Sequence, residues 1–422
     1  MAATAPQDLF GPDATALSDS RAVLAALHAA RALTLALVAH LDEEQLERAH
    51  SPLMSPLVWD LAHIAAYEDL WLAHRHAGLA LLRPDLAESY DAFETPRAQR
   101  GEIELLDTGA ARAYMDDVRA RVAAAILDHG VGDGVVHEMV VRHELQHTET
   151  MRQAMAIAGL LPAGEPPRRG DVDVAPVTSG QALADARRSE PTALRDPGGW
   201  LEIPAGSFAM GAGPGGFAYD NERPRHIVRT EAFRIALRPV TNASWMRFSE
   251  GGGYERREWW SDEGWAWKEE YDITHHPGVA TGPPQAPACH VSWFEADAFA
   301  RAHDARLPTE AEWERAATWE QGSLEHVGAV WEWTSSPFHG YPGFAPHPYR
   351  EYSEVFFGET YRVLRGGSWA TSARVATPTF RNWDLPQRRQ IFAGVRLAKD
   401  VSPPATASTP PTAATPPTTR ET

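Results

Sequence analysis

The sequence is poor in cysteine, with Cys289 alone among 422 residues. One thiol can form no internal disulfide and no cysteine-rich zinc or iron–sulfur site, so any metal ligands would come mainly from the 18 histidines. Long apolar runs are also missing, since no stretch reaches the roughly 18 uninterrupted apolar residues of a membrane span. The N-terminus lacks the basic and apolar regions of a secretory signal. We therefore expect a soluble, cytoplasmic protein.

Basic residues are scarce relative to acidic ones. The chain has 39 Lys and Arg against 57 Asp and Glu, which gives a formal net charge of −18. An acidic surface repels nucleic acid phosphates and anionic membranes, so neither is an expected partner. The chain is 43% hydrophobic and long enough for two ordinary domains.

The first part of the chain, residues 15–160, has the pattern of a four-helix bundle. Its long amphipathic stretches are rich in alanine and leucine, and one begins with Ser55-Pro56, a cap followed by proline at the first helical position. Four helices with modest connections are typical of a bundle. The predicted helices cover 19–50, 55–78, 108–128 and 135–161.

The rest of the chain has a different texture. Residues 161–198 are rich in Pro, Gly and charge, which predicts a linker. Residues 199–400 predict an irregular α+β domain, with helical periodicity only at 292–304 and 309–319. Residues 401–422 are a Pro/Thr-rich tail that cannot bury a core, so we expect it to be disordered.

A candidate metal site lies in HELQH, residues 143–147. His143 and His147 are one helical turn apart on the same face. His63 lies on the apolar face of the second predicted helix, so two helices can bring three imidazoles together. Taken alone, His63 would be interpreted as a core histidine bonded to a backbone carbonyl. Glu144 and Glu149 are the nearest carboxylates and are candidate acceptors that hold the imidazoles in place.

Zinc proteolysis is disfavoured by the residues on the C-terminal side of HELQH. The extended protease pattern HExxHxxGxxH would need glycine and histidine where Thr150 and Gln153 stand. The alternative, a downstream glutamate on a later helix, would fall in the Pro-rich segment, which offers only Glu165. Three histidines with an upstream third ligand instead leave open positions on a metal such as iron(II), as oxygenases require.

Two sets of motifs resemble one known family. WDLAHIAAYEDLWL and RHELQHTETM resemble the DinB-like domain of the ergothioneine-pathway sulfoxide synthases, the hercynine oxygenases. YDNERPRH, RLPTEAEWERAA, VWEWTSSPF, YRVLRGGSW and FRNWDLPQRRQIFAGVRLA resemble the formylglycine-generating-enzyme-like domain of the same family. The resemblance covers about residues 15–400 and points to the actinobacterial-type branch. It implies a DinB-like four-helix bundle followed by a C-type-lectin-like, sulfatase-modifying-factor α+β domain.

The resemblance also implies a reaction and its residues. The family uses iron(II), with O2 as co-substrate, to join the sulfur of γ-glutamylcysteine to hercynine (N-trimethylhistidine) as a sulfoxide. The implied iron ligands are His63, His143 and His147. The implied hercynine contacts are Gln146, Asn382 and Trp383. Tyr349 and Tyr352, in PYREYS, match a tyrosine pair at the site, of which Tyr349 is the implied proton donor. The implied γ-glutamylcysteine contacts are Arg97, Arg100, Asp384 and Arg388.

The residue types suit these roles. Arginine can form two parallel hydrogen bonds to a carboxylate, and aspartate can pair with an ammonium group. γ-Glutamylcysteine carries both kinds of charged group. A tyrosine hydroxyl stays protonated at neutral pH, and an aromatic wall such as Trp383 suits a trimethylammonium group. Without the resemblance, each charged pair would be interpreted as an ordinary surface cluster or local salt bridge.

Departures from the family pattern leave alternatives open. Cys289 stands early in the second domain, which disfavours formylglycine chemistry, and the segment 320–329 is short, so calcium is not predicted. The short loops also leave cysteine or a selenium-containing sugar as alternative donors. A zinc-dependent thiol transferase or hydrolase and a ligand-binding module are further alternatives.

Overall fold

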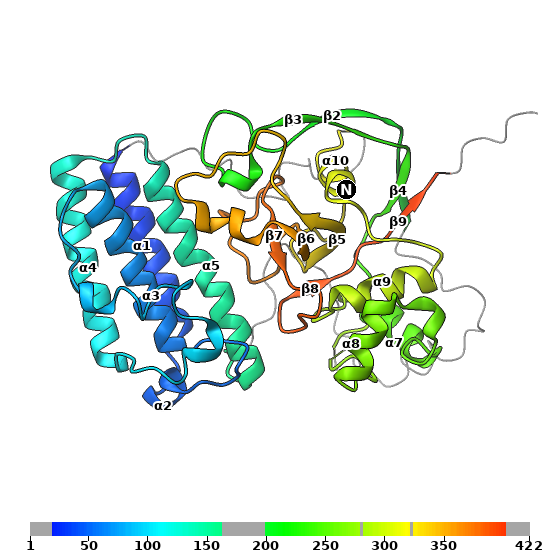
Figure 1. Cartoon of the computed structure of the whole chain (residues 1–422), viewed down its shortest axis with the longest axis horizontal. Helices are drawn as coiled ribbons and strands as arrows, with labels where there is room; N and C mark the ends of the chain where they lie inside the picture. Colours follow the sequence, from blue (N-terminus) through cyan, green and yellow to red (C-terminus); the bar gives the residue numbers. More distant parts are fainter. Residues whose placement is uncertain (1–18, 163–198, 279–281, 321–323, 402–422) are drawn as a thin grey trace, which may run out of the picture.

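The computed structural model describes residues 19–162, 199–278, 282–320 and 324–401. A helical bundle lies beside an α+β part, and α5 is the bundle helix nearest to that second part (Figure 1). The predicted fold class is thereby confirmed. The predicted linker and tail lie almost entirely outside the described residues.

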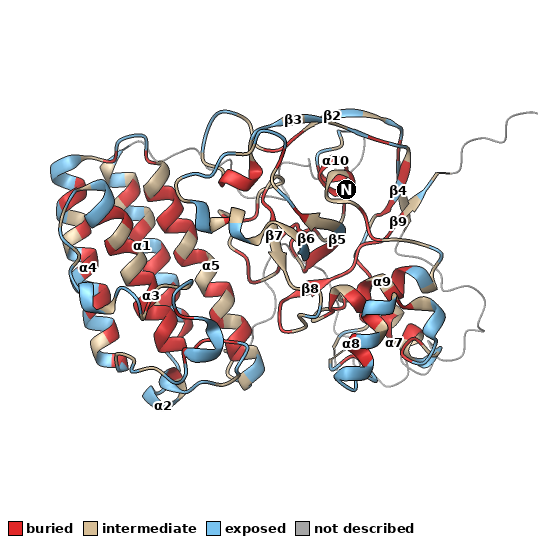
Figure 2. Cartoon of the chain, viewed as in Figure 1, coloured by how far each residue is buried: buried red, intermediate tan, exposed pale blue. Residues whose placement is uncertain are grey.

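The bundle is built from four main helical segments whose buried sides face one another (Figure 2). Its core includes Leu27, Leu61, Val118 and Val122. The helices are α1 (Ser20–Leu37), α2 (Glu43–Glu47), α3 (Leu57–Glu68), α4 (Thr108–His129) and α5 (Val135–Ala158). A π-helix, η2 (Asp69–His76), continues α3, and two 3-10 turns, η3 (Pro84–Leu86) and η4 (Arg97–Gln99), follow it.

Two details of the bundle differ from prediction. The single helix expected over 19–50 is wrong, because α1 ends at Leu37 and a new helix starts at Asp42. Asp42 and Gln45 form a reciprocal capping box, which satisfies free N–H groups and so favours a fresh start. Pro56 is itself the N-cap residue of α3, and the Ser55 hydroxyl accepts a hydrogen bond from Arg100 instead of capping.

Among the described helices, α1 is long and apolar enough to cross a membrane by length and composition alone. In this structure one side of α1 packs into the bundle, with Val23 and Leu27 fully buried. The same side carries Arg31, which pairs with Glu68 and Glu144 at 2.8 and 2.9 Å. This is the pattern of a bundle helix with one face against its neighbours.

The α+β part contains three small sheets and several short helices. One sheet has the order β7-β6-β5-β8, another β1-β4-β9, and β2 pairs with β3. The strands are β1 (Trp200–Ile203), β2 (Gly206–Met210), β3 (His226–Thr230), β4 (Phe233–Ala236), β5 (Trp331–Phe338), β6 (Gly358–Arg365), β7 (Asn382–Asp384), β8 (Ala393–Gly394) and β9 (Ala398–Asp400). The helices are α7 (Asn242–Glu250), α8 (Asp262–Glu270), α9 (Trp293–Ala302) and α10 (Glu310–Ala317). The 3-10 turns are η5 (Asp220–Glu222), η6 (Arg257–Trp259), η7 (Arg350–Tyr352) and η8 (Glu354–Phe356).

Of these helices, α9 and α10 fall at the two predicted stretches. α7 and α8 were not predicted, although Thr241 and Ser261 cap their first turns.

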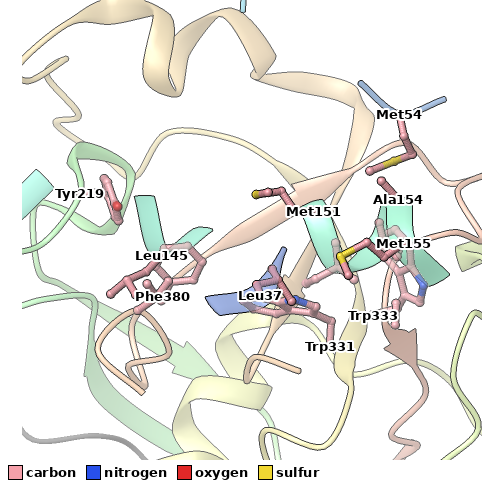
Figure 3. Packing of buried hydrophobic residues seen from close by; sticks show 14 of the residues in the cluster. Leu37, Met54, Leu145, Met151, Ala154, Met155, Tyr219, Trp331, Trp333 and Phe380 are labelled. Atoms are coloured by element: carbon pink, nitrogen blue, oxygen red, sulfur yellow. The ribbon is translucent and has the colours of Figure 1, made fainter. Parts of the chain in front are cut away.

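The two parts meet along α5. Leu145 and Met151 of α5 belong to the same apolar cluster as Trp331, Phe380 and Tyr219 of the α+β part (Figure 3). Polar contacts reinforce this interface, because the buried Glu149 carboxyl accepts hydrogen bonds from Trp331 Nε1 (2.7 Å), Ser368 (2.7 Å) and Thr371 (2.5 Å). One helix therefore joins the bundle to its neighbour.

Candidate metal centre and substrate site

Three imidazoles converge between α3 and α5. The ligand atoms that His63, His143 and His147 offer all lie within 4.8 Å of one another. The Nε2 atoms of His63 and His143 are 3.1 Å apart. The structure thus brings together the predicted set of three histidines, with His63 from α3 and the other two from α5.

Two of these imidazoles are held by hydrogen bonds on their far sides. His63 Nδ1 donates to the Tyr90 carbonyl at 2.6 Å, and His147 Nδ1 donates to Asp60 Oδ1 at 2.8 Å. A carbonyl or carboxylate oxygen can only accept, so each Nδ1 carries a proton, and Nε2 is the nitrogen turned toward the other imidazoles. Such support is usual for histidines that bind metals.

The acceptor roles predicted for the two glutamates are wrong. Glu144 points into the bundle, where it accepts from Arg31 Nε and from the Thr34 hydroxyl, both at 2.9 Å. Glu149 faces the α+β part and accepts from Trp331. Both glutamates lie off the histidine face of α5. The acceptors actually used, Asp60 and the Tyr90 carbonyl, come from other segments of the chain, so spacing around HELQH did not identify them.

The donor set fits a divalent metal ion. Burial, more than any other cause, lowers the pKa of His63 and of His143 well below the usual value, so both rings are neutral at pH 7. Neutral imidazole nitrogens that face each other at this distance repel unless a cation or a proton lies between them. A first-row transition metal satisfies them, and nitrogen donors suit it.

Tyrosines lie beside the histidines. The ring of Tyr67, from α3, stacks on His143 with 3.6 Å between centroids. Its hydroxyl oxygen is 3.2 Å from that of Tyr349, which comes from the α+β part. Burial raises the pKa of Tyr67 well above its usual value and that of Tyr349 to about 12. Both hydroxyls therefore keep their protons at neutral pH.

A second contact between the parts involves Gln146 and Tyr352, both predicted as site residues. Gln146 Oε1 accepts a hydrogen bond from the Tyr219 hydroxyl at 2.8 Å. Tyr219 also stacks on Tyr352, with centroids 4.4 Å apart and an 8° angle between the rings. Sequence reasoning gave Tyr219 no role, and its only signal was a place in the motif YDNERPRH.

Strand β7 carries three predicted residues in a row. Its Asn382 and Asp384 pair with Leu364 and Arg362 of β6. The ring of Trp383 stacks on Phe338, with centroids 4.2 Å apart, and meets Tyr352 edge-on at 5.9 Å. β7 therefore supplies an aromatic wall next to the tyrosine pair.

The predicted charged residues separate into two groups. Burial raises the pKa of the Asp384 carboxyl, while Arg388 and Arg97 act in the opposite direction, and Arg388 Nε lies 3.6 Å from Asp384 Oδ1. Arg97 of the bundle is thus close enough to Asp384 of the α+β part to favour its charged form.

Arg100 does not join them. Its guanidinium donates to the Thr95 and Ala92 carbonyls and to Ser55, and it lies 3.6 Å from the centre of the Trp59 ring. Trp59 in turn stacks on His63 at 4.6 Å between centroids.

The sequence matches two protein families in the same order as the two parts of the structure. Residues 26–151 match the DinB superfamily. Residues 186–326 and 320–401 match the sulfatase-modifying factor enzyme 1-like domain.

Two relatives match most of the chain, and a third matches a shorter stretch. A hercynine oxygenase of Mycolicibacterium thermoresistibile is 42% identical over 438 residues, covering 88% of this chain and 93% of the relative. A hercynine oxygenase of Mycobacterium tuberculosis is 39% identical over 433 residues, covering 88% of this chain and 97% of the relative. Ergothioneine biosynthesis protein 1 of Neurospora crassa is 40% identical over 83 residues, covering 19% of this chain and 9% of the relative.

Proposed function

Because the chain belongs to the hercynine oxygenase family, we propose that it holds iron(II) and uses O2 to join the sulfur of γ-glutamylcysteine to hercynine, forming a sulfoxide. The observation that supports this most directly is the convergence of three imidazoles whose ligand atoms all lie within 4.8 Å of one another. Iron(II) bound by His63, His143 and His147 would supply the one-electron chemistry that O2 activation needs.

Tyr349 is proposed as the proton donor. Its Oη keeps a proton at neutral pH, because burial raises its pKa to about 12. The hydrogen-bonding distance to Tyr67 fixes the direction of this hydroxyl, and Tyr67 is itself fixed by its stack on His143. A neutral donor of this kind can protonate a developing oxyanion without placing a charge beside the site.

Hercynine is proposed to lie against Gln146 and β7. Trp383 and Tyr352 present ring faces and edges that suit a trimethylammonium group. Gln146 stands between two of the histidine ligands on α5 and offers an amide for the polar end of the substrate. Asn382, next to Trp383, is proposed as a further contact.

The thiol donor is proposed to bind where the two parts meet. Arg388 lies beside Asp384, and the charge of Arg97 also acts on this carboxyl, so the region offers two cations and one anion. γ-Glutamylcysteine offers the complementary set of two carboxylates and one ammonium. Arg100, predicted as a fourth contact, has its donors directed to protein atoms, so we propose that it acts through Trp59, which stacks on His63.

The proposal is tested with a panel of donors. Purified protein is supplied with iron(II), O2, hercynine and either γ-glutamylcysteine, cysteine or a selenium-containing sugar, and the products are identified by mass. We expect O2 consumption and a sulfoxide with γ-glutamylcysteine. Turnover with the selenium-containing sugar alone would contradict the donor assignment, and stoichiometric zinc without O2 uptake would contradict the whole proposal.

A pair of matched variants sharpens the donor assignment. Arg97→Gln should raise the KM for γ-glutamylcysteine about tenfold, the size expected for losing one charged hydrogen bond. Arg83→Gln is the control, because Arg83 is also exposed in the segment between η2 and α4 but pairs with Asp85. Equal effects of the two variants would show that Arg97 has no specific role.

A further inference from the structure

The side chain of Tyr219 links the α+β part to Gln146 on α5. It is only 4% exposed, and its hydroxyl donates to Gln146 Oε1 at 2.8 Å. Gln146 directly precedes the ligand His147. The orientation of the Gln146 amide therefore depends on a residue from the other part of the chain.

The ring of Tyr219 is held on several sides. It stacks on Tyr352, and it meets Phe217 and Phe380 edge-to-face with centroids 4.9 and 5.7 Å apart. Figure 3 shows Tyr219 near Phe380 and Leu145 of α5. The backbone N–H of Tyr219 donates to Glu222 at 2.9 Å. These contacts hold the Tyr219 ring in place and so fix the position of its hydroxyl.

The two residues after Tyr219, Asp220 and Asn221, bond to the segment that carries Tyr352. The Ser353 hydroxyl donates to Asp220 and accepts from Asn221 Nδ2 at 2.9 Å. Ser353 directly follows Tyr352, so the turn 219–222 fixes both faces of the contact: Tyr219 itself and the loop that carries Tyr352.

We propose that Tyr219 is a positioning residue that sets the orientation of the Gln146 amide and thereby the binding of hercynine. The Tyr219 hydroxyl donates to Oε1, and the amide also bonds to the Tyr352 hydroxyl, so one N–H of the Gln146 NH2 group is left for the substrate. That group recognises a hydrogen-bond acceptor, which on hercynine is a carboxylate oxygen or the unprotonated ring nitrogen. The inference rests on the function proposed above.

The test measures binding as well as turnover. The iron(II)-loaded protein is titrated with hercynine without O2, so that no reaction occurs, and binding is followed by calorimetry. Tyr219→Phe keeps the ring stack and removes one hydroxyl. We expect it to raise the Kd for hercynine about tenfold, with the KM for γ-glutamylcysteine unchanged within about twofold and kcat reduced less than hercynine affinity.

A double-mutant cycle tests whether Tyr219 acts through Gln146. In a Gln146→Ala background, Tyr219→Phe should change the Kd by less than about twofold, since the partner is already gone. Tyr254→Phe is the matched control, because it also removes a buried hydroxyl of the α+β part, one that bonds to Glu295. This control should alter stability without altering the Kd for hercynine.

The outcomes separate the two proposals. If the unmodified protein binds hercynine and Tyr219→Phe leaves the Kd unchanged, the inference about Tyr219 is wrong and the proposed function stands. An equally large effect of Tyr219→Phe with and without Gln146 would also overturn the inference, because Tyr219 would then act by another route. If the unmodified protein does not bind hercynine, the proposed function fails, and the inference fails with it.

Discussion

At the scale of single residues, the candidate metal centre is defined by the groups behind its ligands. Asp60 and the Tyr90 carbonyl fix the protonated nitrogens of His147 and His63. Trp59 stacks on His63 and carries Arg100 on its ring. The sequence suggested only that His63 could bond to a backbone carbonyl. Tyr90, Asp60 and Arg100 were not identified in these roles, because each lies far along the chain from the residue that it contacts.

Asp60→Ala should weaken metal binding. Without this acceptor the His147 ring loses its fixed orientation and part of its basicity, and such losses cost about 10- to 100-fold in metal affinity. The measurement is an anaerobic iron(II) titration. Asp128→Ala is the control, since that carboxylate is exposed on α4, and similar affinities for the two variants would contradict the assigned role.

A buried histidine away from the centre should make stability depend on pH. His137 is 1% exposed, neither of its ring nitrogens has a hydrogen-bond partner among the described residues, and burial lowers its pKa to about 4. Between pH about 6.5 and 4, His137 is protonated in the unfolded chain but not in the folded one, so acidification favours unfolding. This group alone should contribute a loss of up to about 3 kcal/mol over that range.

Urea unfolding at several pH values checks this expectation. His137→Leu should show a shallower fall of the unfolding free energy below pH about 6.5, by up to one proton's worth of slope. His129→Leu replaces a half-exposed histidine and serves as the control. Parallel pH profiles for His137→Leu and the unmodified protein would contradict the account.

At the scale of elements, α5 has two functional faces. One face presents His143 and His147 to α3, and the other carries Glu138 and Glu149 toward the α+β part. Glu138 receives Arg374 there, and Glu149 receives three donors. Glu138 and Glu149 are buried and the two histidines are partly buried, so α5 is held from two sides.

Glu149→Ala should loosen this interface. It leaves the buried donors of Trp331, Ser368 and Thr371 without an acceptor, which costs about 2–4 kcal/mol in the free energy of unfolding. Chemical denaturation measures the loss. Glu102→Ala, at an exposed position of the bundle, should cost less than about 0.5 kcal/mol, and equal costs would show that Glu149 is not an interface residue.

The elements themselves were predicted with uneven success, and the reasons are physical. Helices α4 and α5 begin near the predicted residues, because in each the apolar pattern repeats over many turns. The break after Leu37 was missed because the alanine- and leucine-rich pattern continues past it, although the capping box at Asp42 marks it in the sequence. The π-helix after Glu68 was not distinguished from α3, because the predicted helical pattern over 55–78 continues through it.

At the scale of the whole molecule, the candidate site draws on both parts of the chain. The histidine cluster was predictable, because two ligands share one helix face and the third lies on the apolar side of another. The electrostatic influence of Arg97 on Asp384 and the hydrogen bond from Tyr219 to Gln146 were not predictable. These contacts are set by how the two parts dock, and no local pattern encodes that arrangement.

Because α5 carries two metal-ligand candidates and also forms the interface with the α+β part, it limits how such a chain can evolve. A bundle that bound its metal alone could be recombined freely with other partners, as many modular proteins are. Here a new partner would have to match the outer surface of the same helix that carries two of the ligands. The two halves are therefore expected to have changed together, one compensating for the other, rather than to have been exchanged as separate units.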